Sequence, residues 1–224
     1  MSEKYTAVLF SGGLDSAVLI ADEIRQTRVQ PLYVSVGFAW EAEERAIASR
    51  FLASPSIVQH VEPLVHLDFD MRDVFTSAHW AVRGEAPAFD TPDEDVFIDG
   101  RNVILLSKAA VFMARAGISR VSMAPLAGNP FPDATPDFFQ AMSRALTLGL
   151  AQPIQIEAPF ATLHKSDVIR KGVALGVPLE LTLSCMQPVD SLHCGRCSKC
   201  RERRDAFNEA AVNDPTSYKQ VPVR

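Results

Sequence analysis

Short apolar runs alternate along the chain with longer segments in which apolar and polar residues recur at helical spacing. The apolar runs, typical of buried strands, lie at residues 6–10, 29–36, 61–67, 119–124 and 153–159. The helical patterns lie between them, at residues 14–25, 41–53, 102–117 and 137–150. This alternation predicts an α/β fold, with a Rossmann-like parallel sheet and helices on both of its faces.

One long stretch, residues 84–99, fits neither pattern. It carries six acidic residues and no basic residue. We expect a solvated loop at this place in the chain. A mobile lid over a binding site is the alternative for a loop of this length.

Length and composition limit the class of protein. A chain of 224 residues with 47% hydrophobic and 22% charged residues is typical of a globular protein. We divide it into an α/β domain at residues 1–180 and a C-terminal segment at residues 181–224. No apolar run approaches the roughly 20 residues of a membrane span. Residues 1–6 leave no room for a signal peptide, so we expect a cytoplasmic protein with no membrane partner.

The charge of the chain bears on its partners. A formal net charge of −5 disfavours an extended nucleic-acid-binding surface, because such a surface usually has an excess of basic residues. We therefore expect a small-molecule substrate and no nucleic-acid partner. The sequence leaves the oligomeric state open, with a homodimer among the choices.

The first predicted strand-to-helix turn has the sequence SGGLDS, residues 11–16. Open α/β sheets bind ligands at such turns, beyond the carboxyl ends of their strands. Gly12 and Gly13 let backbone N–H groups approach an anion, and Gly13 has the freedom for φ > 0 that a branched side chain lacks. The sequence thus predicts a phosphate-binding loop made by Phe10, Ser11, Gly12, Gly13, Leu14, Asp15, Ser16 and Ala17.

Asp15 places a negative charge in this predicted anion site. One explanation is that a Mg²⁺ ion lies between the Asp15 carboxylate and the phosphates, because a bound cation inverts the local charge logic. The other is that the carboxylate only caps the following helix, a frequent function of Asp in a first turn.

Two basic residues are candidate counter-charges for phosphate. Arg101 lies in the sequence GRN, at the entry to a predicted helix, and its planar guanidinium suits a phosphate or a carboxylate. Lys165 lies in the sequence HKSDVIRKG, just before another predicted helix. Taken singly, each is ordinarily a surface charge. The predicted phosphate loop makes both of them candidate ligands.

All four cysteines of the chain fall within one short C-terminal stretch. Three of them form two overlapping C-x-x-C units, and in a reducing compartment such clustering favours a metal over disulfides. Four thiolates meet the tetrahedral demand of a structural Zn²⁺ ion and leave no position open for catalysis. The same spacing occurs in iron–sulfur proteins, which remain the rival interpretation. The predicted metal ligands are Cys185, Cys194, Cys197 and Cys200.

A cluster of basic residues follows within the same stretch. We expect it to form a solvent-exposed helix face and not an RNA-binding surface. The cluster comprises Arg196, Lys199, Arg201, Arg203 and Arg204.

The string SGGLDS resembles the signature of the PP-loop ATP pyrophosphatases, which have an adenine nucleotide alpha hydrolase-like fold. Further matches are GRN, PD and PDFF within residues 132–139, HKSDVIRKG, and HCGRCSKCRERRDAF at residues 193–207. With them, nearly the whole chain resembles the 7-cyano-7-deazaguanine synthases, the zinc-containing PP-loop enzymes of queuosine precursor biosynthesis.

The resemblance implies an AMP-forming ligase. ATP activates the carboxylate of 7-carboxy-7-deazaguanine, ammonia gives the amide, and a second ATP drives dehydration to the nitrile, with release of AMP and pyrophosphate. The implied cofactors are ATP, Mg²⁺ and Zn²⁺. Asp15, Arg101 and Lys165 are the implied catalytic residues.

The chain departs from the family pattern in several places. Residues 36–38 read Val-Gly-Phe where the family tends to have Tyr-Gly-Gln, and Asp99 replaces a proline. A polar segment of the family is altered at Ala124, Ala127, Ala134 and Thr135. Specificity for a purine-like edge rests on a few placed donors and acceptors, so these changes bear on the substrate more than on ATP.

Three alternatives therefore stay open at the level of sequence. A divergent relative could activate a different carboxylate. A tRNA-thiolating PP-loop enzyme would hold an iron–sulfur cluster on the same cysteines. A non-catalytic nucleotide-binding module would keep the loop without turnover.

Overall fold

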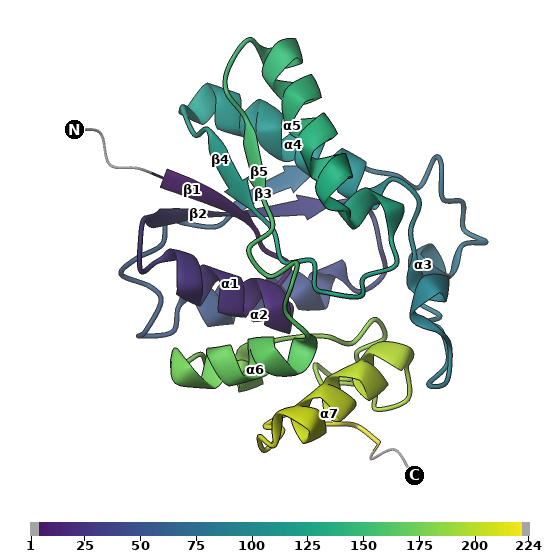
Figure 1. Ribbon diagram of the computed structural model, residues 1–224. Coiled ribbons are helices and arrows are strands. Elements are labelled where there is room, and N and C mark those ends of the chain that lie inside the picture. The colour runs from purple at the N-terminus through teal and green to yellow at the C-terminus, as the bar shows by residue number, and fades with distance from the viewer. Residues whose placement is uncertain (1–4, 221–224) are drawn as a thin grey trace.

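A parallel five-stranded sheet forms the centre of the molecule (Figure 1). The computed structural model describes residues 5–220, apart from the side chain of residue 93. The strand order is β3-β2-β1-β4-β5, and every neighbouring pair is parallel. The strands are β1 (Tyr5–Leu9), β2 (Arg28–Ser35), β3 (Val65–Asp68), β4 (Arg120–Ser122) and β5 (Gln155–Glu157).

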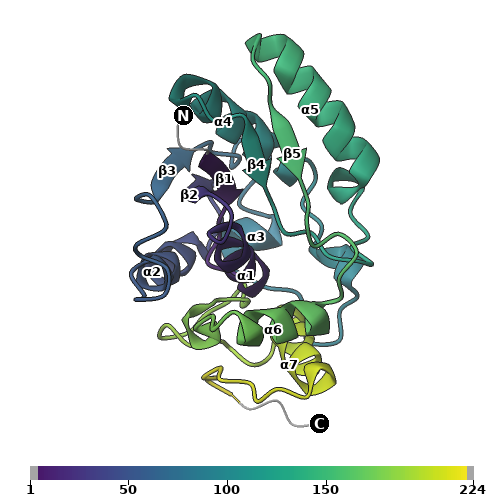
Figure 2. The same ribbon diagram turned by 60° about the vertical axis from the view of Figure 1, so that its left-hand side comes forward.

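Helices cover both faces of this sheet, as the turned view shows (Figure 2). On one side lie α1 (Leu14–Glu23), α2 (Glu41–Leu52), α6 (Lys165–Ala174) and α7 (Ser198–Ala210). On the other side lie α4 (Arg101–Ala116) and α5 (Pro136–Leu150). The short helix α3 (Trp80–Arg83) and three 3-10 turns, Asp93–Val96, Pro132–Ala134 and Leu179–Leu181, complete the described elements. The predicted fold class is confirmed.

The alternation of side chains along β1 explains how one strand serves two cores. Ala7 packs into a cluster with residues of α4 and α5, whereas its neighbour Val8 packs into a cluster with residues of α1, α2 and α6. Both side chains are fully buried because successive residues of a strand point to opposite faces. Phe207 of α7 is buried in the second of these clusters, so the C-terminal segment shares a core with the sheet.

The topology creates one crevice for a ligand. From β1 the chain moves to β2 and β3 on one side, and later to β4 and β5 on the other. The crossovers therefore leave the β1–β4 pair in opposite directions, and open α/β sheets bind their ligands beyond the carboxyl ends of such strands. The third strand is the largest departure from the predicted boundaries: it spans Val65–Asp68, while Val61 makes only an isolated bridge to Val29. Pro63, which has no N–H to donate, lies between the two pairings.

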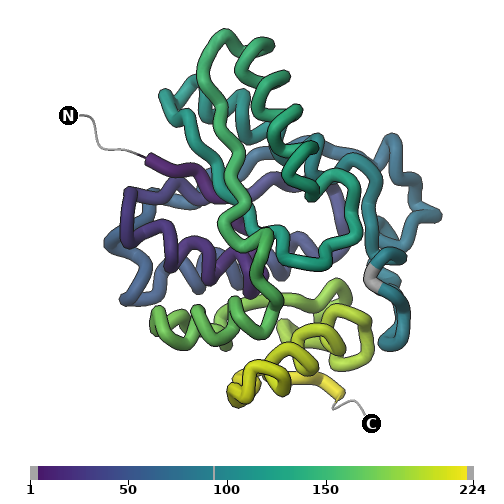
Figure 3. The backbone as a smooth tube through the Cα atoms, viewed as in Figure 1, coloured from purple at the N-terminus to yellow at the C-terminus, as the bar shows by residue number. Residues whose placement is uncertain are grey.

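The acidic segment 84–99 is less solvated than its composition predicts. Val96 and Ile98 are buried, so the end of the segment packs into a hydrophobic cluster. The segment also approaches the C-terminal part of the chain, where Ala88 forms an isolated bridge with Cys197; Figure 3 traces its course as a tube. Apolar residues among the acids supply this packing, which the charge count concealed.

No helix within residues 5–220 combines the length and the apolar character that a membrane crossing requires.

Candidate active site

A cavity of about 280 Å³ opens at the crevice between β1 and β4. Its walls come from four places: the turn after β1, the end of β2 with the start of α2, the segment 96–98 with the start of α4, and the segment 123–133 after β4. The charged lining residues are Asp15, Glu41, Glu44, Arg101 and Asp133. The chain thus brings together groups from distant parts of the sequence at the position that the topology predicts.

The turn after β1 is shaped by two glycines with different tasks. Gly12 has φ +76°, and a Cβ atom there would lie 2.7 Å from Ile47 Cγ2 and 3.0 Å from the Glu44 carbonyl oxygen. Gly13 has φ −71°. Gly13 therefore does not use the freedom for φ > 0 that glycine allows. Gly12 has the unusual backbone angle, and the close approach of α2 also leaves no room for a side chain there.

Hydrogen bonds fix the rest of the loop. The Gly13 N–H donates to Ser11 Oγ at 3.2 Å, and Ser16 Oγ donates to the Gly13 carbonyl at 3.0 Å. The Leu183 N–H donates to the Gly12 carbonyl at 2.8 Å, which ties the loop to the C-terminal part of the chain. Both serine side chains therefore stabilise the loop through hydrogen bonds within it.

Five of the eight predicted loop residues line the cavity: Phe10, Ser11, Gly13, Asp15 and Ser16. The other three serve the packing of the loop. Leu14 and Ala17 are buried in the hydrophobic core behind it, and Gly12 packs against α2. The sequence motif therefore mixes residues that face a ligand site with residues that hold the loop in shape.

Asp15 does not cap α1. The N-cap is Gly13, with no side-chain cap hydrogen bond, so the capping explanation was wrong. Asp15 Oδ2 instead accepts a hydrogen bond from Lys165 Nζ at 3.0 Å. The other oxygen, Asp15 Oδ1, is buried and has no hydrogen-bond partner among the described residues. A buried carboxylate oxygen without a partner is costly, so this one is suited to a cation or a donor that comes with a ligand.

Arg101 enters the same cavity from the first turn of α4. Its Nε atom is buried and, within the described part of the chain, lacks a hydrogen-bond partner. The next residue is held firmly, because the Asn102 N–H donates to Asp133 Oδ2 at 2.9 Å and Asn102 Nδ2 donates to the Asp133 carbonyl at 3.0 Å. Burial raises the pKa of Asp133. Asp133 is a site residue whose role the sequence did not reveal, although it lies in the matched PD motif.

Glu44 and Tyr33 form a second feature that sequence reasoning missed. The Tyr33 hydroxyl donates to Glu44 Oε2 at 2.8 Å, and both residues line the cavity. Burial, with a smaller effect of Glu41, raises the pKa of Glu44 to about 7, although Arg101 and the Tyr33 hydrogen bond oppose the shift. No local pattern pointed to Glu44, because the helical segment 41–53 reads simply as charged on one face.

The four cysteines come together as one buried group at the start of α7. Their Sγ atoms all lie within 4.8 Å of one another. The Sγ–Sγ distances include 3.9 Å for Cys185–Cys197, 3.9 Å for Cys194–Cys200 and 3.5 Å for Cys197–Cys200. Four sulfurs around a single ion at about 2.3 Å would stand roughly 3.8 Å apart, so the group fits one tetrahedral metal ion.

The surroundings of the sulfurs support the same reading. Backbone N–H groups of Gln187 and Cys194 each donate to Cys185 Sγ at 3.3 Å. The Arg196 N–H donates to Cys194 Sγ at 3.4 Å. Such donors stabilise thiolates, the form in which cysteine binds a metal. In a 4Fe-4S cluster each cysteine binds a separate iron atom, which spaces the sulfurs more widely than a single ion does.

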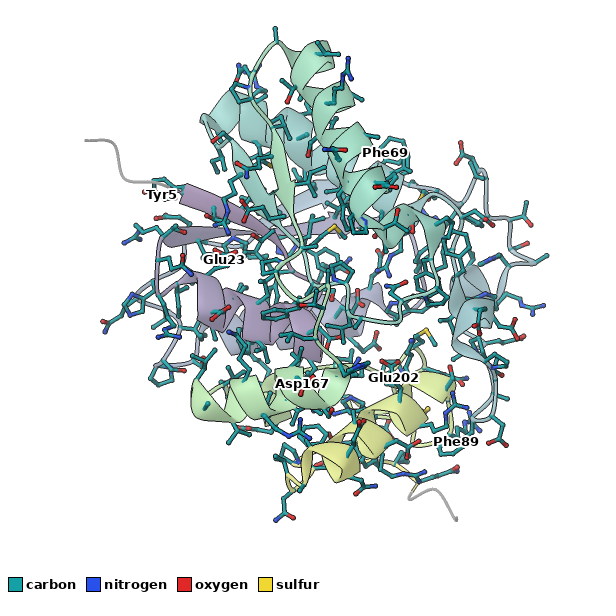
Figure 4. All side chains as sticks on the ribbon, in the orientation of Figure 1. Tyr5, Glu23, Phe69, Phe89, Asp167 and Glu202 are labelled. Carbon is teal, nitrogen blue, oxygen red and sulfur yellow. The ribbon has the colours of Figure 1, made fainter. Side chains whose placement is uncertain are left out.

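The basic cluster around these cysteines is not a solvated helix face. Arg203 is fully buried, Arg201 donates to the carbonyl groups of Phe89 and Thr91, and Arg204 stacks over the Phe89 ring at 4.9 Å. Figure 4 labels Phe89 beside α7. The expectation failed because the partners of these residues are main-chain oxygens and a ring from segments distant in sequence. Arg196 alone of the five is exposed.

Comparison with known proteins gives consistent matches over the length of the chain. A family model described as queuosine biosynthesis protein QueC matches residues 6–211. A 7-cyano-7-deazaguanine synthase from Anaeromyxobacter dehalogenans is 34% identical, over 96% of both chains. The synthase of that name from Thermoplasma acidophilum is 33% identical, over 100% of this chain and 95% of its own. A third, from Pseudomonas putida, is 31% identical over 97% of this chain and all of its own.

Among solved structures, the U34-tRNA thiolase NcsA from Methanococcus maripaludis with its 4Fe-4S cluster matches at a TM-score of 0.49. The identity is 11%, over 98% of this chain and 75% of that chain. A likeness this distant carries no argument about the ligands or the activity of the present chain.

Proposed function

Because the chain belongs to the QueC family of queuosine biosynthesis proteins, we propose that it is an ATP-dependent ligase. Its relatives from Anaeromyxobacter dehalogenans and Thermoplasma acidophilum are 7-cyano-7-deazaguanine synthases. Its substrate is the carboxylate of 7-carboxy-7-deazaguanine, its nitrogen donor is ammonia, and its products are the nitrile, AMP and pyrophosphate. ATP supplies the adenylyl group that activates first the acid and then the amide.

One observation supports the proposal that ATP binds in this cavity. Asp15 and Arg101 bear opposite charges, line one cavity, and each has a buried polar atom without a hydrogen-bond partner among the described residues. A Mg²⁺ ion bound to a polyphosphate would supply both missing partners, the cation for Asp15 Oδ1 and a phosphate oxygen for Arg101 Nε. The N-terminus of α1 adds the positive end of a helix dipole at the same place.

The roles of the chain's own residues follow from their positions. Ser11, Gly13 and Ser16 shape the phosphate loop, and Asp15 holds the Mg²⁺ ion. Arg101 and Lys165 offset the negative charge of the phosphates, which lowers the cost of placing polyphosphate in a half-buried cavity. Lys165 does not itself line the cavity, but its Nζ atom lies 3.0 Å from Oδ2 of Asp15, a lining residue.

We propose zinc as the ion of the four-cysteine group. The sulfur distances fit a single tetrahedral ion, and four thiolates leave no open position, so the metal would serve structure and not catalysis. The ATP site and the cysteines then have separate functions: one binds the reactant, and the other orders the C-terminal segment. We further infer a cytoplasmic enzyme that acts on a free small molecule without nucleic acid.

The substrate pocket favours a second candidate for the carboxylate. Ala124, where the family is usually polar, lines the cavity, whereas Thr135 accepts a hydrogen bond from the Phe138 N–H and caps α5. Val36 and Phe38 are buried core residues, so those departures lie in the packing and not in the pocket. Only the change at Ala124 removes a polar group from the cavity wall. A relative that activates another flat aromatic carboxylate is therefore the second candidate.

Product analysis tests the proposal. The protein is incubated with ATP, Mg²⁺, ammonia and 7-carboxy-7-deazaguanine, and nucleotides and heterocycles are followed by mass. We expect AMP and pyrophosphate in equal amounts, released in step with amide and nitrile. ADP and inorganic phosphate as main products would overturn the ligase assignment. AMP formed only with a different aromatic carboxylate would select the second candidate.

A further inference from the structure

Lys165 is held by two carboxylates that come from opposite ends of the chain. Its Nζ atom donates to Asp15 Oδ2 at 3.0 Å and to Glu202 Oε1 at 2.8 Å. The second oxygen of Glu202 accepts from Lys199 Nζ at 2.6 Å. The four side chains form an alternating row of charges that leads from the phosphate loop to α7, and Figure 4 labels Glu202 where α7 approaches α6.

All the members of this row are substantially shielded from water. The side chain of Lys165 is 15% exposed, and those of Asp15 and Glu202 are 25% and 24% exposed. Burial by itself would lower the pKa of Lys165, but the two carboxylates outweigh that effect and raise it. A shielded ammonium group needs a fixed negative partner, because it has lost most of its water.

Ligand binding would weaken one of the two partners of Lys165. Under the proposed function, Asp15 Oδ1 would face Mg²⁺ while Oδ2 stays beside Lys165, so the cation would draw part of the Asp15 charge away from the ammonium group. Glu202 would then be the carboxylate that holds Lys165 beside the phosphate loop.

Glu202 lies on the same helix as the last cysteine of the four-cysteine group. The helix α7 begins at Ser198, directly after Cys197, and Glu202 lies two residues beyond Cys200. The other end of the cysteine segment also reaches the loop, since the Leu183 N–H donates to the Gly12 carbonyl at 2.8 Å. The predicted metal ligands thus lie between one direct contact with the phosphate loop, at Leu183, and one made through Lys165, at Glu202.

We propose that Glu202 is a positioning residue of the ATP site: it fixes Lys165 beside the phosphate loop and so couples metal binding by the four cysteines to ATP binding. The proposal rests on the proposed function, because it takes the loop as the ATP site. It assigns to the cysteine segment an effect on nucleotide affinity in addition to its effect on folding. By linkage, the coupling acts in both directions: bound metal favours ATP, and bound ATP retains the metal.

Direct nucleotide binding tests the role of Glu202. Glu202→Gln keeps the shape and removes the charge, and Glu209→Gln makes the same change at an exposed position of the same helix. We expect Glu202→Gln to bind Mg²⁺-ATP roughly 10- to 100-fold more weakly, as for the loss of other supporting partners of a ligand site. Its zinc content should equal that of the wild type, and Glu209→Gln should bind ATP normally.

A double-mutant cycle with Lys165→Met separates positioning from a general structural effect. If Glu202 acts through Lys165, the double variant binds ATP no more weakly than Lys165→Met alone. Additive losses would overturn the proposal, as would normal ATP affinity in Glu202→Gln. A wild-type protein that fails to bind ATP would instead overturn the proposed function, so the two failures are distinguishable.

A measurement on the wild type needs no variant and covers the case in which Glu202→Gln does not fold. Zinc transfer to a coloured chelator is timed with and without Mg²⁺-ATP. We expect the nucleotide to slow zinc release several-fold, and free Mg²⁺ or AMP alone to have no such effect. Equal rates with and without Mg²⁺-ATP, at concentrations that saturate the site, would contradict the coupling.

Discussion

At the scale of single residues, the site is defined by buried polar atoms that lack a hydrogen-bond partner among the described residues. Asp15 Oδ1 and Arg101 Nε are buried and have no hydrogen-bond partner among the described residues, whereas Glu41 accepts from the N–H groups of Val36 and Gly37. A satisfied carboxylate such as Glu41 fixes the backbone, and an unsatisfied one is available to a ligand. Among the carboxylates of the cavity, this difference distinguishes a side chain that can bind a ligand from one that stabilises the backbone.

Asp15→Asn tests the assignment of a Mg²⁺ ligand. The change preserves the shape of the side chain and removes its charge. We expect turnover to fall by roughly 10²-fold, because the cation loses its protein carboxylate, and to recover in part as Mg²⁺ is raised. Steady-state rates at a series of Mg²⁺ concentrations give the result. A loss that Mg²⁺ does not relieve would speak against a role in holding the metal.

Glu44→Gln tests the raised pKa of a half-buried carboxyl group. The folded-state pKa of about 7 lies above the ordinary value of 4.5, so the native state holds a proton that the unfolded chain releases between those pH values. Ionised Glu44 therefore lowers the free energy of unfolding as pH rises from about 4.5 to 7.

Replacing Glu44 by Gln removes this cost and keeps an acceptor for Tyr33. We expect little change in stability at pH 4.5 and a gain of roughly 1–3 kcal/mol at pH 8, measured by urea unfolding. Glu43→Gln, on the same helix and outside the cavity lining, is the matched control. An equal effect of Glu44→Gln at both pH values would show that the carboxyl group has an ordinary pKa.

At the scale of the elements, the phosphate loop connects two elements and contacts two further parts of the molecule. It ends β1, begins α1, and packs against the first turns of α2 through Gly12. Its carbonyl group at Gly12 also accepts from Leu183, in the segment that leads to the cysteines. The geometry of the loop therefore depends on elements that lie far from it in sequence.

Alanine substitutions at the two glycines distinguish packing from ligand binding. Gly12→Ala introduces a Cβ atom 2.7 Å from Ile47 Cγ2 at φ +76°, so we expect a loss of roughly 1–3 kcal/mol in the free energy of unfolding. Gly13→Ala has an ordinary φ of −71°, and its Cβ atom would lie 3.1 Å from Ser11 Oγ. We expect it to fold with little loss of stability and to bind ATP more weakly.

Urea unfolding and equilibrium ATP binding are measured on both glycine variants. The contrast between them is the prediction. Equal loss of stability in the two variants would show that the close approach of α2 does not set the requirement at Gly12.

At the scale of the whole molecule, the C-terminal segment completes the core and contacts the phosphate loop through Leu183. Phe207 is buried against the same cluster as Val8 of the central strand. Arg203 is fully buried and donates to Thr182 Oγ1 at 2.8 Å and to the Leu179 carbonyl at 2.9 Å, so its charge is spread over several acceptors. Losing the order of this segment exposes apolar core and leaves buried charges unpaired.

Cys197→Ser tests the dependence of the fold on the metal. We expect the variant to lose its zinc and to melt more than about 10 °C below the wild type, because structural zinc contributes folding free energy directly. Metal analysis and thermal unfolding provide the measurement. Ser198→Ala is the matched control: Ser198 is fully buried beside the cysteines, its Oγ has no partner among the described residues, and we expect it to retain zinc. A zinc-free Cys197→Ser protein with unchanged melting would contradict the structural role.

The sequence by itself determined the features that depend on local pattern. The alternation of apolar runs and helical segments predicted the parallel sheet, because side-chain period reports the burial of each element. The position of residues 11–16 between a strand and a helix predicted the loop at the ligand-binding edge. The spacing of Cys194, Cys197 and Cys200 predicted one metal group, since a short chain segment holds these thiols close whatever the rest of the fold does.

Tertiary structure alone decided which groups meet. Asp15 and Lys165 are 150 residues apart in sequence, and Glu202 joins them from the last helix. The crowding that requires glycine at position 12 comes from a neighbouring helix, and the pKa of Glu44 comes from burial against other elements. Contact and desolvation are properties of the packed chain, so no local pattern of residue types contains them.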